Sequence, residues 1–172
     1  MLSTNSFALA FKGLKLDTLW YDPAAPKIRV EAEVPEICRV NFPKWEIIHF
    51  DFPARGDMPP VRLNWYSGGG AVKEIFPMGQ KIMGPPAAPG DRDKRHFSTH
   101  AGSLLVGQEG YIYGTGHSAT TVFLPEEKFA DLGDPPEVLP RGGGPEREWF
   151  AACRGGTPGL SNFDYSGPQT EL

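Results

Sequence analysis

The chain has 172 residues and a formal net charge of −4, with its lysines and arginines scattered rather than clustered. Because a nucleic-acid backbone requires a basic surface, we expect no nucleic-acid partner. No apolar run approaches the roughly 20 residues that span a bilayer, and the N-terminal segment lacks the order of a signal peptide, so we expect no membrane partner and a cytoplasmic location.

Length and composition together predict one folded domain over residues 1–172. The chain contains 21 glycines and 18 prolines, which is about twice the usual share, yet 40% of its residues are hydrophobic. That combination is typical of strands joined by long ordered loops. Two cysteines, Cys38 and Cys153, are too few for a disulfide framework, so we expect two free, buried thiols.

Strict alternation of apolar and polar residues predicts the first strand at residues 28–34, IRVEAEV, half-buried and antiparallel. Its polar positions are Arg29, Glu31 and Glu33. We predict two further strands from aromatic and β-branched content, at residues 45–52 (WEIIHFDF) and at residues 61–66 (VRLNWY).

The loop between the second and third strands, PARGDMPP at residues 53–60, is long for a hairpin and holds three prolines. It is either a rigid spacer or a binding loop. Arg55 and Asp57 are its candidate substrate-binding residues. Among the aromatic residues that could stack on a sugar ring, we select Trp65 and Tyr165 as further candidates.

Residues 67–102 are rich in glycine and proline and predict a long loop excursion. His96 and His100 are four residues apart, which on a helix would place both imidazoles on one face. The surrounding sequence is not helical and provides no third ligand, so we predict no metal site. We interpret His49 as a hydrogen-bonded residue of the sheet rather than a catalytic base.

The second half predicts a β-meander from residues 103–107, 110–114 and 120–124. Two helices follow, one after Pro125 and one over PEREWFAAC at residues 145–153. In the second helix we expect a buried stripe, formed by Trp149, Phe150 and Cys153. The predicted fold class is therefore α+β, an open and mostly antiparallel sheet with a few helices packed on one face and long Gly/Pro-rich loops.

Two glycine-rich motifs do not indicate a nucleotide site. GTGHSA, residues 114–119, satisfies G-x-G-x-x-A, but a β-branched run follows where a helix would have to begin. GGG at residues 68–70 lacks the GK[ST] of a phosphate loop. We also find no nucleophile motif of a hydrolase. No catalytic, cofactor-binding or metal-binding residue is assigned.

Several segments, taken together and in order, resemble the C-terminal region of the Gfo/Idh/MocA family, the glucose-fructose oxidoreductases, inositol dehydrogenases and their relatives. The resemblance covers about four-fifths of the chain, in residues 30–34, 42–69, 102–116, 124–131, 139–153 and 160–172. It implies a two-domain NAD- or NADP-dependent enzyme, in which this region is an open antiparallel sheet that covers a sugar or polyol substrate and often forms the oligomer interface.

The chain departs from the family pattern because it contains no Lys-Pro dipeptide, no valid dinucleotide fingerprint and no Gly-Asp…His segment ahead of FALAFKGLKL at residues 7–16. Both flanks look trimmed, and the last residues resemble the start of a closing helix that is missing. We therefore expect a substrate-covering and oligomerisation domain that is inactive alone, pairing as a homodimer or higher oligomer through an apolar outer sheet face. The alternative is a free-standing carbohydrate-binding or scaffolding module.

Overall fold

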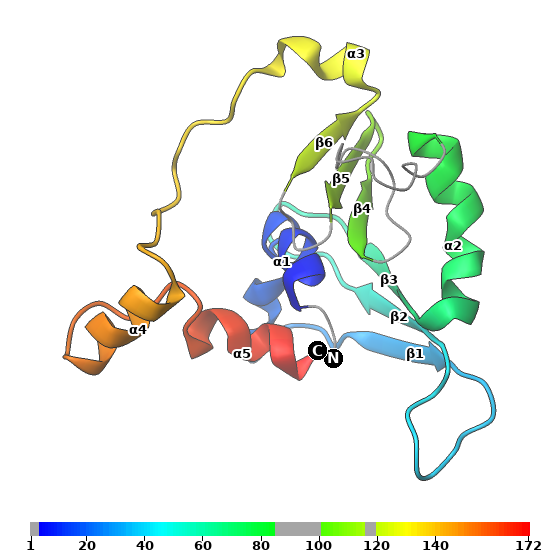
Figure 1. The fold of residues 1–172 in the computed structure, drawn as a ribbon, viewed down its shortest axis with the longest axis horizontal. Helices are drawn as coiled ribbons and strands as arrows, with labels where there is room; N and C mark the ends of the chain where they lie inside the picture. The colour runs from blue at the N-terminus through cyan, green and yellow to red at the C-terminus, as the bar shows by residue number, and fades with distance from the viewer. Residues whose placement is uncertain (1–3, 85–100, 116–119) are drawn as a thin grey trace.

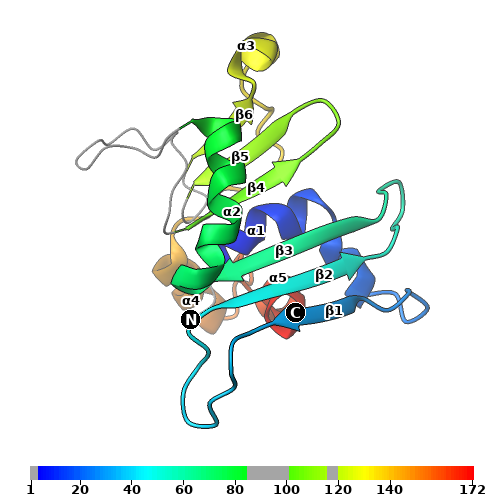
Figure 2. The ribbon, with the colours of Figure 1, turned by 90° about the vertical axis from the view of Figure 1, so that its right-hand side faces the viewer.

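The computed structural model describes residues 4–84, 101–115 and 120–172. These residues form five α-helices and two open, antiparallel sheets of three strands each. The predicted α+β class and the open antiparallel pairing are confirmed, but the strands form two separate sheets where one was expected. In Figures 1 and 2 the sheets lie between two helices, α1 (Thr4–Gly13) on one side and α2 (Gly68–Met83) on the other.

The first sheet has the order β1-β2-β3, with β1 at Arg29–Glu33, β2 at Glu46–Phe52 and β3 at Val61–Ser67. Its inner face carries Phe50 and Phe52, which pack against Phe11 of α1 and Leu16 of the 3₁₀-helix η1 (Leu16–Trp20). Helix α1 was not predicted. Its apolar residues nevertheless follow helical spacing, at positions 7, 10 and 11, with Leu14 just past its end, and so form the stripe that meets the sheet.

Strand β1 keeps the predicted alternation in its pairing with β2 but is exposed on both faces. Val30, opposite Phe50 in the register, is 53% exposed. The buried residues of α1 and η1 pack with β2, and no residue of β1 belongs to their core cluster. The expectation of a half-buried strand is therefore wrong, because alternation identifies an apolar face but not the element that covers it.

The second sheet is the predicted meander, in the order β4-β5-β6 (Gly102–Val106, Tyr111–Thr115 and Thr121–Leu124). Tyr113 in the central strand and Val122 in β6 are buried. Helix α1 contacts β4 and β5 as well as η1. It is thus a shared packing partner for the two halves of the chain.

Residues 68–83, expected within a long loop, instead form helix α2. Three glycines at its start and Pro77 in its interior lower the intrinsic helix propensity of this segment. Packing against β2 and β3 stabilises the helix in spite of that composition. The remainder of the predicted excursion, including His96 and His100, lies almost entirely outside the described residues.

Both helices predicted in the last third are confirmed, as α3 (Glu126–Phe129), which continues into the 3₁₀-helix η3 (Ala130–Leu132), and as α4 (Pro145–Cys153). The expected buried stripe on α4 is wrong, because none of its residues is buried. Cys153 and Cys38 are both free and exposed rather than buried. The sequence pattern and the Pro145 start predicted the helix correctly, but α4 makes no extensive contact with another described helix or strand.

The last segment, in which we expected only the lead-in to a helix, is itself helix α5 (Phe163–Glu171), capped by the Asn162 side chain. Trp20 donates a hydrogen bond from Nε1 to Glu171 at 3.0 Å, and Leu172 packs against the first core. Across the described parts of the chain, every helix is too short or too polar to cross a bilayer.

Candidate functional site: the outer polar face of the first sheet

The outer face of the first sheet carries charged and amide side chains in register. We call this surface the outer polar face; its polar residues are Arg29, Glu31, Glu33, His49, Asp51, Arg62 and Asn64, and the row of Glu33 continues into the buried Ile47 and into Tyr66. These residues alternate with the apolar ones of the inner face, so each strand presents its polar side chains to the same side. The apolar outer face expected for pairing with a twin sheet is not found in two of the three rows, because those rows are polar, and only Ile47 and Tyr66 in the third row are apolar or aromatic.

One row of this face is formed by charged residues of all three strands. Arg29, Asp51 and Arg62 are aligned across β1, β2 and β3. Arg62 donates two hydrogen bonds to the Asp51 carboxylate, from Nε at 2.6 Å and from Nη2 at 2.8 Å, and these bonds lower the pKa of Asp51. Arg29 pairs with Glu31 on its own strand. The row therefore has one guanidinium group on each side of one carboxylate.

The second row is centred on His49, in the middle strand. Its Nδ1 lies 2.6 Å from Asn64 Oδ1 on β3, and its Nε2 lies 3.0 Å from Glu33 Oε1 on β1. Both ring nitrogens thus meet oxygen atoms, and both can donate only when the imidazole is protonated. Hydrogen bonds to Asn64 and then to Glu33 raise the pKa of His49 above its ordinary value of 6.5. The prediction that His49 is a hydrogen-bonded sheet residue is confirmed.

This geometry predicts a pH-dependent contribution of His49 to stability. A folded pKa above the unfolded value means that the contribution is fully present below about pH 6.5 and is lost as pH rises through the folded pKa. We expect less than about 1 kcal/mol, because the Glu33 carboxylate is largely solvated. Urea unfolding between pH 5.5 and 8.5 should show this loss in the parent chain and not in His49→Gln. Equal pH dependence of the two proteins would contradict the assignment.

The predicted site residues Arg55 and Asp57 lie at the far end of the β2–β3 hairpin. Arg55 is 6% exposed and donates to three backbone carbonyls: Nε to Leu14 at 2.7 Å, and Nη1 to Pro53 at 3.1 Å and to Pro59 at 3.0 Å. Burial lowers the pKa of this guanidinium. Arg55 therefore holds its own loop against the turn between α1 and η1.

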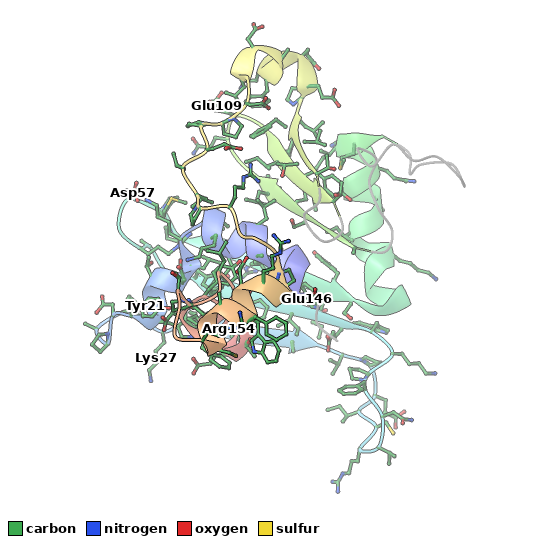
Figure 3. All side chains as sticks on the ribbon, turned by 60° about the vertical axis from the view of Figure 1, so that its left-hand side comes forward. Tyr21, Lys27, Asp57, Glu109, Glu146 and Arg154 are labelled. Carbon is green, nitrogen blue, oxygen red and sulfur yellow. The ribbon has the colours of Figure 1, made fainter. Side chains whose placement is uncertain are left out.

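Asp57, by contrast, is exposed at the tip of the same loop (Figure 3). It accepts a hydrogen bond from Lys15 Nζ at 2.7 Å, which lowers the pKa of Asp57. Backbone hydrogen bonds between Arg55 and Met58 close a two-residue turn around Gly56, whose φ of +53° suits glycine. Of the two expectations for this loop, the rigid spacer fits these contacts better.

Trp65 and Tyr165, the two aromatic candidates, lie apart from this loop and from the outer polar face. Trp65 is on the inner face of β3, where its ring packs edge-on against Phe7 with a centroid separation of 6.4 Å. Tyr165 is half-buried on α5, with Lys12 Nζ 5.2 Å from its ring centroid. The four candidates do not converge on one place.

Sequence reasoning assigned the polar residues of β1 to one face but did not identify a site there. The signal was present in the alternation of all three strands. What was missing was the register, which places Glu31 opposite His49 and His49 opposite Asn64. Such cross-strand neighbours come from separate segments, so a single sequence does not show their alignment.

The remaining motifs fit neither a nucleotide nor a metal. Gly114 and Thr115 end strand β5, and the next described residues lead into strand β6 instead of the helix a pyrophosphate site requires. Residues 116–119 of that motif lie outside the described residues. Within the part of the chain that the structure describes, no three His, Cys, Asp or Glu side chains are grouped to hold a metal ion.

Comparison with known proteins gives no family to which the chain can be assigned. No protein-family model, no curated protein and no solved structure matches it.

Proposed function

We propose that this chain is the substrate-covering and assembly domain of an NAD- or NADP-dependent sugar or polyol oxidoreductase, and that it is inactive alone. The observation that carries the proposal is the outer polar face. Its guanidinium, carboxylate, imidazole and amide groups provide donors and acceptors side by side, which is the chemistry that recognises vicinal hydroxyl groups. In this proposal, a separate nucleotide-binding domain carries out the hydride transfer.

The groups on this face retain hydrogen-bonding capacity for a ligand. Arg62 uses two of its five N–H groups on Asp51, so three remain for a substrate oxygen. The Asp51 carboxylate accepts those two bonds and can accept about two more. Because the ion pairs already orient these side chains, a ligand would not have to pay their full ordering entropy.

Binding of a simple polyol tests this role. We expect myo-inositol or glucose to raise the melting temperature of the chain, since a ligand at 100 times its dissociation constant adds about 2.7 kcal/mol to the free energy of unfolding. The double variant Asp51→Asn/Arg62→Gln should raise the dissociation constant for the polyol at least about tenfold, because each charged hydrogen bond is worth roughly 1.5–3 kcal/mol. Thermal unfolding measures the melting temperature, and isothermal titration calorimetry measures the dissociation constants.

The control for the polyol test is Arg141→Gln, which removes a more exposed arginine–glutamate pair with a separation of 2.8 Å, outside the face. This control should bind the polyol as the parent chain does. Propanol, which has no vicinal hydroxyls, should not stabilise the protein. If neither polyol binds at 100 mM, or if the double variant binds as well as the control, the outer polar face is not a polyol site.

Assembly is the second part of the proposal, as a homodimer or higher oligomer. Among the described residues, fifteen large hydrophobic side chains are exposed and only eight hydrophobic residues are buried. The chain exposes 12,691 Å² in total, whereas a compact monomer of 18.8 kDa exposes about 8,300 Å². Surface of this kind is typical of a subunit that is covered by other polypeptide.

The alternative function is a free-standing carbohydrate-binding or scaffolding module, and the same polar face favours it equally. Addition of the coenzyme separates the two. A domain that works beside a nucleotide-binding partner should bind polyol with unchanged affinity when NADH or NADPH is added, and should acquire oxidoreductase activity only when that partner is supplied. A free-standing module should bind its saccharide and gain no activity with any partner.

A further inference from the structure

Two exposed apolar surfaces lie in segments that are far apart in the sequence. The first, the arm, comprises residues 131–162 and contains α4. The second, the β1–β2 loop, comprises residues 34–45 and joins the first two strands. Figure 1 shows α4 and this loop projecting from opposite sides of the molecule, so one chain does not bring them together.

The arm presents an aromatic pair to solvent. Trp149 and Phe150 are 64% and 55% exposed, and their ring centroids are 5.2 Å apart. Helix α4 makes no extensive contact with another described helix or strand, although Glu148 accepts a hydrogen bond from the Leu160 amide at 2.8 Å. Figure 3 shows α4 at the surface, with Glu146 near its start and Arg154 at its end. The arm is thus folded locally but not covered.

Among the described residues outside the arm, the β1–β2 loop is the most exposed apolar segment. Ile37, Val40 and Phe42 are 78%, 88% and 97% exposed. Isolated exposed apolar residues are common on proteins, but three within six positions form a surface that favours burial against a partner.

The available area suits a stable dimer. Along the arm and at its junction with α5, large apolar side chains expose on the order of 100 Å² each, which gives about 700 Å² for the seven of them, Leu132, Val138, Leu139, Trp149, Phe150, Leu160 and Phe163. A standard interface buries about 800 Å² per partner. Two such contacts, related by symmetry, exceed that requirement.

The two surfaces also have complementary charge. The arm carries five acidic side chains and three basic ones, and is therefore net negative. The loop carries Arg39 and Lys44 against Glu36, and is net positive. Complementary charge at the edge of an apolar contact favours one pairing over another and accelerates association.

We propose that two copies of this chain clasp each other, the arm of each copy covering the β1–β2 loop of the other. A two-fold axis makes both contacts equivalent, so the assembly closes as a dimer and does not extend into a filament. The Trp149–Phe150 pair is the anchor, because tryptophan is among the residues most enriched at the hot spots that carry interface binding energy. This assembly does not use the outer polar face and is independent of polyol binding.

The two cysteines allow a direct test, since Cys38 lies in the loop and Cys153 lies at the end of α4, and both are free and exposed. Hydrogen bonds from the backbone of Val40 and Asn41 lower the pKa of the Cys38 thiol, which favours its reaction near neutral pH. A short bismaleimide should join Cys38 of one copy to Cys153 of the other. Mass spectrometry of the linked peptides, on a mixture of isotopically light and heavy chains, identifies the link as intermolecular.

Cysteine variants make this test specific. Cys38→Ser and Cys153→Ser, each alone, should give no linked dimer. An equimolar mixture of the two should give a dimer with a single link, because one complementary pair remains. Links only between like cysteines, or no link at a chain concentration of 100 µM, would overturn the proposal.

Sedimentation equilibrium gives an independent test that does not depend on cross-linking. Trp149→Ser/Phe150→Ser and Val40→Ser/Phe42→Ser should each weaken the dimer at least about 100-fold, and Val106→Ser, an exposed residue of β4, should not. Mixing the arm variant with the loop variant should recover part of the association through one intact contact. A loop variant that dimerises like the parent chain would contradict the clasp. Polyol binding by both variants keeps this outcome distinct from failure of the proposed function.

Discussion

Arg55→Ala is expected to destabilise the chain by about 3–5 kcal/mol, although Arg55 was selected from the sequence as a substrate-binding residue. The guanidinium is buried and donates to the carbonyls of Leu14, Pro53 and Pro59. Alanine leaves those acceptors without their donor, and each loss of this kind costs roughly 1–3 kcal/mol.

The prolines make this arginine hard to replace. Pro53, Pro59 and Pro60 have no backbone N–H, so this loop has few donors of its own. The remaining Nη2 of Arg55 is buried without a hydrogen-bond partner in the described part of the chain. This unsatisfied donor offsets part of the stability that the three hydrogen bonds of Arg55 contribute. We therefore place the expected loss at about 3–5 kcal/mol rather than at the sum of three charged bonds.

Equilibrium unfolding in urea measures the effect of Arg55→Ala, with Arg62→Ala as the control. Arg62 is also an arginine with two good hydrogen bonds, but it is exposed, so its removal should cost much less stability than the removal of Arg55. If Arg55→Ala unfolds like the parent chain and loses polyol affinity, Arg55 is a substrate residue after all.

Gly68→Ala is the second substitution with a large expected effect, about 3–5 kcal/mol. Gly68 begins α2 with a φ of +82°, a conformation that costs other residues about 1–2 kcal/mol. A Cβ atom there would lie 2.2 Å from the Lys44 carbonyl oxygen and 2.7 Å from Trp45 Cα. Both neighbours are backbone atoms, so relief of the overlap requires the start of β2 to move.

Gly69→Ala is the matched control for Gly68→Ala. The two glycines are adjacent and both belong to α2, but a Cβ at Gly69 would meet nothing within 4 Å. Alanine at position 69 should therefore leave stability unchanged or raise it by up to about 1 kcal/mol, because it restricts the unfolded chain and favours the helix. Comparison of the melting temperatures of the two variants separates the cost of steric overlap at position 68 from the general effect of replacing glycine by alanine in this helix. Equal melting temperatures would refute the close approach of α2 to β2.

The strands could be predicted from the sequence because alternation is local and each strand satisfies it by itself. The ends of β2 and β3 lie within one residue of those predicted. Helix α2 could not be predicted, because Gly68, Pro77 and Gly79 argue against a helix and its stability depends on β2 and β3. Propensity is a weak guide where tertiary contacts of this kind compete with it.

Burial was the least predictable property, for a related reason. The apolar residues of α4 follow a helical stripe, yet Trp149 and Phe150 face solvent in the single chain. A sequence pattern shows which face of an element is apolar, but the element that covers it is set by the fold or by another molecule. The outer polar face illustrates the opposite case, since its rows exist only through the pairing of three separate strands.

The contact between α5 and the first core has a consequence for how the chain acquires its structure. Trp20 and Glu171 are hydrogen-bonded across a separation of 151 residues, and Leu172 packs with the same cluster as Phe11. Closing so long a loop costs chain entropy before it returns any favourable contact, which slows barrier crossing. During synthesis, strands β1 to β3 can pair early, but the contacts that Trp20 and the first core make with α5 form only after residues 163–172 have left the ribosome.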